Sequence, residues 1–409
     1  MTLGVGSAFA DTVDPTPIPV GFAPAGVAIT PDGGRAYVTN FGAGTVSVID
    51  TSDNTVTATV PVGTYPQVVA IAPDGLRAYV TNRGSGTVSV INTVDNTVDP
   101  TPIPVGGTPV SVAITPDGLR AYVTHWEGTL SVINTVDNTV TTAPVPGGAG
   151  LWGMAITPDG GRAYVTNQSN GTVSVINTAD YSMVGTPITA GSTPSSVAFT
   201  PDGLRAYVTN QNGASVSVIN TSDNTVTATI GVGGHPYGVA FTPDGLRAYV
   251  ANQDDSTVSV INTIDNTVTA IALPAGGRSF GVAITPDGLR AYVTNNGNVT
   301  VSVITIEIAP TLTGAPPAGV VGKPYTHAFT LTGQPVPTVT AVGALPAGLT
   351  LTEAGVLSGT PTEAGAFAVT VTASNGIGTP ATLDATLTIT AAPKPPATGS
   401  LGSLGNFGS

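Results

Sequence analysis

The stretch "QVVAIAPDGLRAYVTNRGSGTVSVINTVDNTVDPTPIPV" (residues 67–105) contains four short segments rich in Val, Ile and Thr, separated by turn residues. These segments, 67–72, 77–82, 87–93 and 97–105, are predicted strands, because β-branched and aromatic residues favour extended backbone. The turns between them contain Pro-Asp-Gly, Gly-Ser-Gly and Asp-Asn, which accept the backbone angles of tight turns. One copy of this stretch therefore predicts a unit of four strands.

The same unit recurs along the chain with an even period. The Asp of its Pro-Asp-Gly turn stands at Asp32, Asp74, Asp117, Asp159, Asp202, Asp244 and Asp287. Successive copies lie 42 or 43 residues apart, and four strands in about 40–45 residues are typical of a β-propeller blade. The seven copies therefore predict an all-β chain with a seven-bladed propeller.

The two ends of the repeat region complement each other. The segment "TVDPTPIPVG" ends the second copy at residues 97–106 and also stands alone at residues 12–21, whereas the seventh copy stops at about Ile308 without a fourth strand. Thr12 precedes the first turn Asp by 20 residues, the same interval as in the second copy. We therefore predict that the N-terminal segment pairs with the third strand of the last blade and closes the ring. Its prolines suit an outermost strand, whose free edge must not pair with other chains.

The motif "AYVTN" follows the Pro-Asp-Gly turn in five copies, with "AYVTH" (121–125) and "AYVAN" (248–252) in the other two, and "TVSVI" or a close variant comes after it. This pattern resembles the YVTN-family β-propeller repeat over residues 11–308. The resemblance implies an extracytoplasmic protein, secreted or at the cell surface. The family is similar in fold to seven-bladed lactonase-like propellers, some of which are enzymes, so the fold alone does not decide activity.

The C-terminal part has a different pattern. Residues 309–390 contain "LPAGLTL" and "GVLSGTP" and resemble the immunoglobulin-like domain of bacterial surface proteins. Alternating segments with frequent Gly and Pro turns also predict a small antiparallel β-sandwich. Residues 391–409 are of low complexity and predict a disordered tail.

The N-terminus bears on where the protein is found. The first ten residues, "MTLGVGSAFA", end in an A-x-A pattern, which is typical of a signal-peptide cleavage site. We interpret residues 1–10 as the remnant of a longer signal peptide, cleaved before Asp11. The alternative is an accidental A-x-A in a chain rich in alanine. The expected location is extracellular, secreted or associated with the cell surface.

Composition excludes several classes of partner and site. The net charge is −13 and the chain has two lysines, so nothing supplies the clustered cations that bind nucleic acid. The sequence contains no run of eighteen apolar residues that would span a membrane. With no cysteines, disulfides and thiolate metal sites are excluded. We predict no cofactor and no metal, and we expect a monomer that binds an extracellular protein or a glycan.

The irregular residues of the repeat gather on one predicted face. Propeller topology places there the loops between second and third strands and the loops that lead into each first strand. His125 and Trp126 are therefore predicted to lie close to Trp152. The other candidates, in leading loops around the ring, are Tyr65, His235, Tyr237, Arg278 and Phe280. Exposed aromatic rings beside a central channel suit a sugar-like ring or a peptide; the alternative is ordinary loop packing.

The repeated residues favour structural roles. Seven of the nine arginines follow a Pro-Asp-Gly turn, and we predict that they pair with the Asp of that turn and pack their aliphatic stems on a neighbour. A cationic ring for ligands is the alternative, but a binding site usually breaks the symmetry of a repeat. The tyrosine two residues later is predicted to pack between blades.

Two functions remain open at this point. The first is a non-catalytic binding or scaffold protein that presents a propeller face to a ligand or partner. The alternative is an enzyme, such as a lactonase-like hydrolase or a redox propeller. Metal-assisted hydrolysis needs several converging His or acidic side chains. The propeller has only His125 and His235, with Glu127, Asp254 and Asp255 on the same predicted face, so we predict no enzyme activity.

Overall fold

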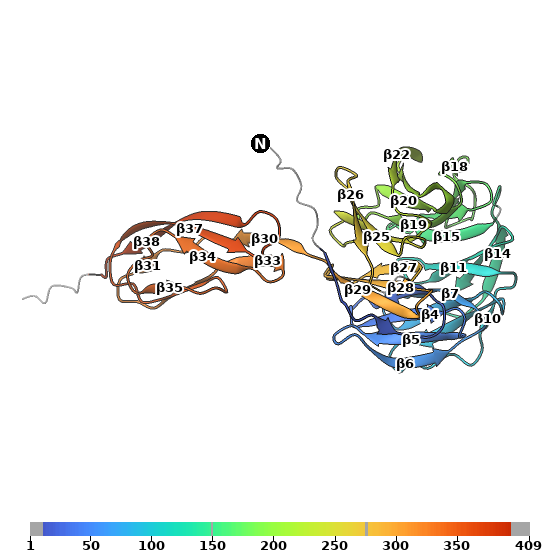
Figure 1. Ribbon diagram of the computed structural model, residues 1–409, viewed down its shortest axis with the longest axis horizontal. Helices are drawn as coiled ribbons and strands as arrows, with labels where there is room; N and C mark the ends of the chain where they lie inside the picture. The colour runs from blue at the N-terminus through green and yellow to red at the C-terminus, as the bar shows by residue number, and fades with distance from the viewer. Residues whose placement is uncertain (1–10, 149, 275–276, 394–409) are drawn as a thin grey trace, which may run out of the picture. The chain divides into compact units, whose positions relative to one another are not determined.

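The computed structural model describes residues 11–148, 150–274 and 277–393. The predicted signal remnant (residues 1–10) and all but the first three residues of the predicted tail lie outside the described residues. The chain forms two compact units, which meet between Ile306 and Glu307 (Figure 1). This boundary lies two residues before the one predicted from the sequence, because Ile308 already pairs within the second unit.

Six sheets of the first unit consist of four consecutive antiparallel strands each. Blades 1 to 3 are β3 (Pro24–Ile29), β4 (Arg35–Asn40), β5 (Thr45–Asp50) and β6 (Thr55–Pro61); β7 (Pro66–Ile71), β8 (Arg77–Asn82), β9 (Thr87–Asn92) and β10 (Ile103–Pro104); and β11 (Pro109–Ile114), β12 (Arg120–His125), β13 (Thr129–Asn134) and β14 (Val140–Pro144). Blades 4 to 6 are β15 (Leu151–Ile156), β16 (Arg162–Asn167), β17 (Thr172–Asn177) and β18 (Ile188–Thr189); β19 (Pro194–Phe199), β20 (Arg205–Asn210), β21 (Ser215–Asn220) and β22 (Thr225–Gly231); and β23 (Pro236–Phe241), β24 (Arg247–Asn252), β25 (Thr257–Asn262) and β26 (Val268–Ala272).

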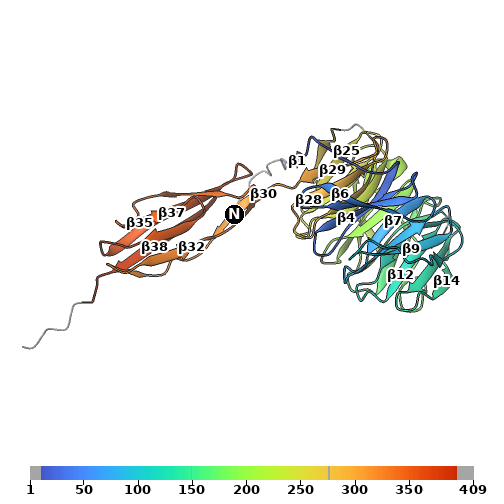
Figure 2. The same ribbon diagram turned by 90° about the horizontal axis from the view of Figure 1, so that it is seen from below.

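The seventh blade joins the two ends of the propeller chain. Its first three strands are β27 (Ser279–Ile284), β28 (Arg290–Asn295) and β29 (Thr300–Thr305), and its outer strand is supplied by β1 (Thr12–Val13) and β2 (Ile18–Pro19). Thr12 lies opposite Thr305 and Ile18 opposite Val301, and β1 is seen beside β29 in Figure 2. The ring closure predicted from the sequence is therefore confirmed.

Each blade is joined to the next by the tyrosine of its second strand. Tyr37 is fully buried and packs with Ala78, Val80 and Ile91 of the next blade. Its hydroxyl donates to Oδ1 of Asn96 over 2.7 Å. The tyrosines at this position are buried in all seven blades, which confirms that they serve packing.

The arginine after each Pro-Asp-Gly turn makes a different contact from the one predicted. Nη1 of Arg120 donates to the carbonyl oxygen of Thr178 in the next blade over 2.8 Å, and the same contact recurs in five other blades. The turn Asp instead accepts hydrogen bonds within its own turn, as Asp117 does from the N–H of Leu119 over 3.0 Å. The predicted ion pair within the turn is therefore wrong, because the extended second strand carries the arginine toward the neighbouring blade.

The arginine of the sixth blade breaks this pattern with an ion pair to the N-terminal segment. Nη1 of Arg247 lies 2.9 Å from Oδ1 of Asp11, and their side chains are 9% and 1% exposed. The Tyr249 hydroxyl donates to Oδ2 of the same carboxylate over 2.6 Å. Burial, followed by the charge on Asp11, raises the pKa of Tyr249, so its hydroxyl stays protonated and donates. Asp11 thus links the start of the chain to the sixth blade.

The second unit is a small β-sandwich with its own core, in which all strand pairs but the parallel pair of β31 and β38 are antiparallel. Its strands are β30 (Ile308–Thr313), β31 (Gly319–Val320), β32 (Tyr325–Ala328), β33 (Thr330–Gln334), β34 (Thr338–Val342), β35 (Leu349–Leu351), β36 (Val356–Gly359), β37 (Gly365–Ser374) and β38 (Ala381–Thr390). One sheet has the order β31-β38-β37-β34 and another β32-β36-β35. Leu387, Val371 and Leu357 are buried between them, as expected for an immunoglobulin-like sandwich.

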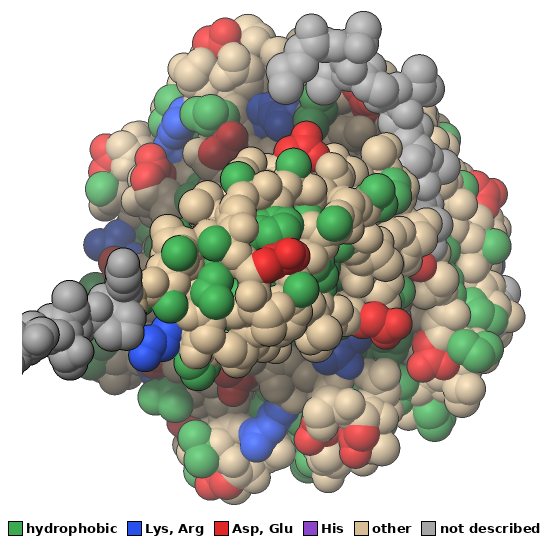
Figure 3. Space-filling view, turned by 90° about the vertical axis from the view of Figure 1, so that its left-hand side faces the viewer, with side chains coloured by type: hydrophobic (Ala, Val, Ile, Leu, Met, Phe, Trp, Pro, Cys, Tyr) green, Lys and Arg blue, Asp and Glu red, His purple; other side chains and the backbone are tan. Residues whose placement is uncertain are grey.

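Strands account for nearly all regular structure in the described residues. The single exception there is a short 3₁₀ turn, η1 (Gln211–Gly213), and none of the described segments forms a helix that could cross a bilayer. The surface in Figure 3 is mostly uncharged, with separated acidic and basic side chains. This agrees with a chain in which only 9% of residues are charged.

Candidate functional site

On one face of the propeller, a backbone hydrogen bond joins two loops of each blade: the loop that leads into the first strand and the loop after the second strand. The residue after the YVTN-like motif donates its backbone N–H to the carbonyl of the residue before the first strand. Arg83 bonds to Tyr65 in this way, and Gln253 to His235, each over 3.0 Å. We call the surface formed by these loops the mouth face. The Pro-Asp-Gly turns lie at the other end of the first strands.

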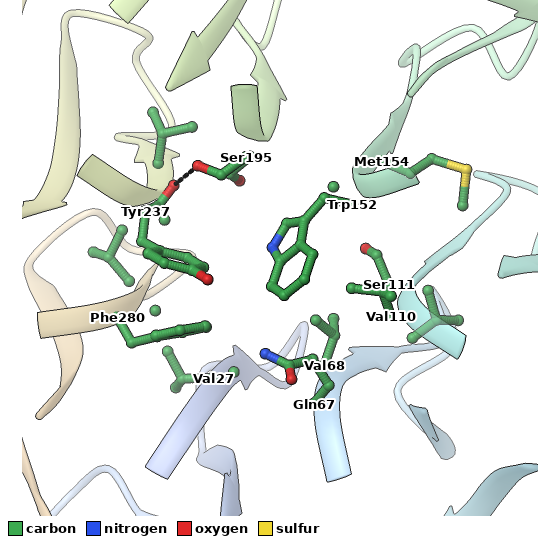
Figure 4. A pocket seen from close by; sticks show the side chains of 18 residues that line it. Val27, Gln67, Val68, Val110, Ser111, Trp152, Met154, Ser195, Tyr237 and Phe280 are labelled. Atoms are coloured by element: carbon green, nitrogen blue, oxygen red, sulfur yellow. Dashed lines mark hydrogen bonds between the residues drawn. The ribbon is translucent and has the colours of Figure 1, made fainter. Parts of the chain in front are cut away.

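The first strands of the seven blades surround a central channel. The second residue of each first strand forms a set that we call the channel ring: Ala25, Gln67, Val110, Trp152, Ser195, Tyr237 and Phe280. This position varies from blade to blade, whereas most other strand positions repeat. A cavity of about 180 Å³ lies at this level of the channel, lined by most of the channel ring. Figure 4 shows Trp152, Gln67 and Tyr237 directed toward its centre.

Aromatic side chains form a continuous cluster from this cavity to the mouth face. The Tyr237 and Phe280 rings lie 3.8 Å apart between centroids, with an interplanar angle of 30°. Trp152 meets Tyr237 edge to face at 6.1 Å, and Trp126 meets Trp152 at 6.0 Å. We call Trp126, Trp152, Tyr237 and Phe280 the aromatic cluster. The structure thus brings together four of the predicted site residues.

Two polar side chains next to the cluster were missed in the sequence analysis. The Arg83 guanidinium carbon lies 5.5 Å from the centroid of the Trp152 ring, a cation–π distance. Gln211 is only 8% exposed, and its Nε2 has no hydrogen-bond partner among the described residues. Burial raises the pKa of Tyr237, and the Gln211 side chain and the Arg83 charge partly oppose that rise. Gln211 therefore lies near the Tyr237 hydroxyl, while Arg83 lies over the Trp152 ring.

The remaining predicted site residues lie outside the aromatic cluster. Tyr65 is 53% exposed and stacks on Phe41 at 5.0 Å. Nδ1 of His235 lies 2.8 Å from Oδ2 of Asp254, and Arg278 is exposed. All of these belong to the mouth face, but none lines the cavity.

Two expectations about the site residues need correction. His125 was expected at the exposed face, but it is 1% exposed, and its Nε2 lies 2.8 Å from Oγ of Ser131. It occupies the place of the YVTN asparagine, which is buried in the other blades. Trp152, Tyr237 and Phe280 were expected in leading loops, but they stand on β15, β23 and β27. Each first strand begins earlier than predicted, so these side chains line the channel.

The burial of His125 predicts a pH-dependent contribution to stability. Burial lowers the pKa of its imidazole below the ordinary value of 6.5, while Glu127 partly opposes this. The unfolded chain therefore takes up a proton at pH values where the folded protein does not, so stability falls as the pH drops below about 6.5. His125→Asn restores the residue found in the other six blades. We expect it to remove the fall in stability that His125 causes at low pH. The check is the urea midpoint of both proteins from about pH 8 to about pH 5. Parallel pH profiles for the two proteins would contradict it.

The channel-ring residues of the cavity provide aromatic faces, one amide and two hydroxyls. Within residues 11–148, 150–274 and 277–393, no three His or acidic side chains come together as metal ligands. His235 and Asp254 are the titratable pair on the mouth face, and their side chains are 40% and 58% exposed.

Comparisons with known proteins agree with the architecture. Residues 117–273 match the family model "Lactonase, 7-bladed beta-propeller", and residues 307–390 match the model "Putative Ig domain". A chain of "Kuenenia stuttgartiensis Hydrazine Synthase" is similar in structure, with a TM-score of 0.63 and 24% identity over 69% of this chain and 95% of that one. This likeness bears on the fold alone. The search of curated proteins gave no match. The chain is therefore a seven-bladed β-propeller followed by an immunoglobulin-like domain, while the finer YVTN assignment stays a prediction.

Proposed function

We propose that this chain is a non-catalytic binding protein, secreted or displayed at the cell surface, whose propeller holds a ligand at the mouth face. The A-x-A pattern and the resemblance to surface-type repeats support the proposed location. The binding role follows the aromatic cluster. A glycan or an extracellular protein segment is the partner class that fits an opening lined by aromatic side chains.

One observation carries the binding role. In three blades the channel-ring position holds a large aromatic residue of the aromatic cluster, whereas the other four blades have smaller or non-aromatic residues there. Four blades fill this ring with Ala, Gln, Val or Ser, so packing alone does not require an aromatic side chain there. Trp152, Tyr237 and Phe280 are only half-buried, unlike the tyrosines between blades, which are 0% exposed. Their rings therefore leave apolar surface facing the cavity, which supports a role in ligand contact.

Trp152→Val tests this role, because Val is the channel-ring residue of blade 3. We expect the variant to fold and to lose binding by at least about tenfold. The probes are a glycan array and a peptide array, followed by titration of each hit with wild-type protein and variant. Leu204→Ser is the matched control, since Leu204 is 62% exposed in a Pro-Asp-Gly turn at the opposite face. Equal binding by Trp152→Val and wild type would contradict the proposal.

A hydrolase is the second candidate, favoured by the lactonase model match and by the His235–Asp254 pair. A carboxylate that orients an imidazole is an arrangement used for general-base attack of water on a carbonyl. The test is hydrolysis of γ- and δ-lactones by wild type and by His235→Thr, which carries the residue of blade 5 at this position. We expect rates no higher than buffer for both. Turnover that disappears in His235→Thr would replace the binding proposal with the enzymatic one.

A further inference from the structure

We propose that the mouth binds a sugar ring bearing a carboxylate, that is, a hexuronate residue at the end of a chain or as a glycoside. This inference rests on the proposed binding function and adds the chemical class of the ligand. It is carried by three neighbouring features: the aromatic cluster, the Arg83 cation and the buried amides of Gln67 and Gln211.

The aromatic cluster supplies the surface for the ring. Trp152 projects into the cavity (Figure 4), with Tyr237 at 6.1 Å and Trp126 at 6.0 Å, both edge to face with it. Trp152 lines the cavity and is only half-buried, so part of its indole surface is open to a ligand. The C–H groups on one side of a pyranose ring are weakly positive, so they pack well on the negative face of an aromatic ring.

Arg83 supplies a positive charge that the propeller does not neutralise. In the described part of the chain, no carboxylate lies within ion-pair distance of its guanidinium. The three acidic side chains of the mouth face are held within their own blades. Glu127 accepts from the N–H of Thr108 over 3.0 Å, Asp254 pairs with His235, and Asp255 accepts from the N–H of Gly234. A ligand carboxylate is the complement that this half-buried guanidinium lacks.

Amide groups beside the same cavity suit hydroxyls. Gln67 is 4% exposed, and its side chain points into the cavity (Figure 4). Gln211, a second buried amide, lies outside the residues that line the cavity and acts on the Tyr237 hydroxyl, whose burial-raised pKa it lowers. A buried amide is costly unless it is hydrogen-bonded. Sugar hydroxyls, which both donate and accept, match a carboxamide better than a peptide side chain without polar groups does.

The size and charge of the site narrow the ligand further. A cavity of about 180 Å³ is comparable to the cavity of about 150 Å³ that holds benzene in another protein, so it has room for one ring. The net charge of −13 opposes the approach of any anion. Selectivity for a carboxylate must therefore come from contact with Arg83 rather than from long-range attraction.

The test compares two glycosides that differ only at C6. Both tryptophans of the chain belong to the aromatic cluster, so intrinsic fluorescence reports this site directly. We expect methyl β-D-glucuronide to bind the full chain at least about tenfold more tightly than methyl β-D-glucoside. In Arg83→Gln the preference for the glucuronide should disappear, so that the two affinities become equal. Gln stands at this position in blades 4, 5 and 6, so the variant should fold.

The outcomes separate the ligand class from the binding role. Equal affinity of wild type for the two glycosides, or an unchanged preference in Arg83→Gln, would overturn the uronate proposal. A response to a peptide or a neutral glycan but not to the glucuronide would overturn it as well, while leaving the mouth as a binding site. If no glycan or peptide probe alters the fluorescence of wild type, the binding role itself fails.

Discussion

Asp11→Ala is expected to lower the free energy of unfolding by about 3–5 kcal/mol, the usual loss when one partner of a buried ion pair is removed. The substitution leaves the Arg247 guanidinium, with its side chain 9% exposed, without the carboxylate at 2.9 Å. It also removes the acceptor of the Tyr249 hydroxyl. Because Asp11 directly precedes β1, we expect the substitution to weaken the pairing of β1 with β29 that closes the ring.

The measurement is urea unfolding of the full chain, compared with two variants. Asp14→Ala changes an acidic residue of the same segment whose side chain accepts from the N–H of Thr16 at an exposed site, and it should cost no more than about 0.5 kcal/mol. Asp11→Asn keeps the hydrogen-bond acceptor but not the charge, so its loss should lie between those of the other two. Equal midpoints for Asp11→Ala and Asp14→Ala would show that the ion pair does not secure the closure.

Gly153→Ala is the second substitution with a large expected effect. A Cβ at Gly153 would lie 2.1 Å from the carbonyl oxygen of Ser195 and 2.9 Å from Cα of Ser196. Both atoms belong to the backbone of β19, so the first strands of blades 4 and 5 would have to separate. We expect a loss near the upper end of about 1–3 kcal/mol, the range for overpacked cores. Ligand binding should weaken as well, because Trp152 is the adjacent residue.

The control for Gly153→Ala is Gly231→Ala. Gly231 ends β22, and a Cβ there would have no atom within 4 Å. Removing a strand glycine at an open site should be neutral or slightly stabilising, because it restricts the unfolded chain. Thermal unfolding of both variants distinguishes the two effects. Similar midpoints would mean that the first strands around the channel are not tightly packed.

The closure of the ring could be predicted from the sequence because it depends only on the spacing of residues along the repeat. The interval from Thr12 to the first turn Asp equals the corresponding interval in the second copy, and β1 indeed pairs with β29. The hydrogen-bond partners of the repeated arginines could not be predicted from this spacing. Asp117 is near Arg120 in the chain, but the acceptor of Arg120 is the carbonyl of Thr178, 58 residues away. Contacts between blades depend on how strands approach in space, which spacing along one blade does not reveal.

The candidate site was predicted in part. The sequence predicted that Trp126 of blade 3 lies close to Trp152 of blade 4, and the two rings are indeed in contact. His125 was misplaced, although its position in the repeat, that of the buried asparagine, contained the necessary signal. Arg83 and Gln67 were missed because each looks ordinary in its own blade. Aligning the seven copies at the residue after the YVTN-like motif would have shown Arg83 as a departure from the glutamine of blades 4, 5 and 6, and aligning them at the second residue of the first strand would have shown that the position of Gln67 differs in every blade.

A crystal structure of the full chain grown with methyl β-D-glucuronide tests most directly whether the mouth is a ligand site. We expect density for one pyranose ring in the cavity, stacked on Trp152, with its carboxylate beside Arg83 and hydroxyls near Gln67. A cavity that holds only water while the glycoside is absent or bound elsewhere on the propeller would contradict a ligand role for the aromatic cluster.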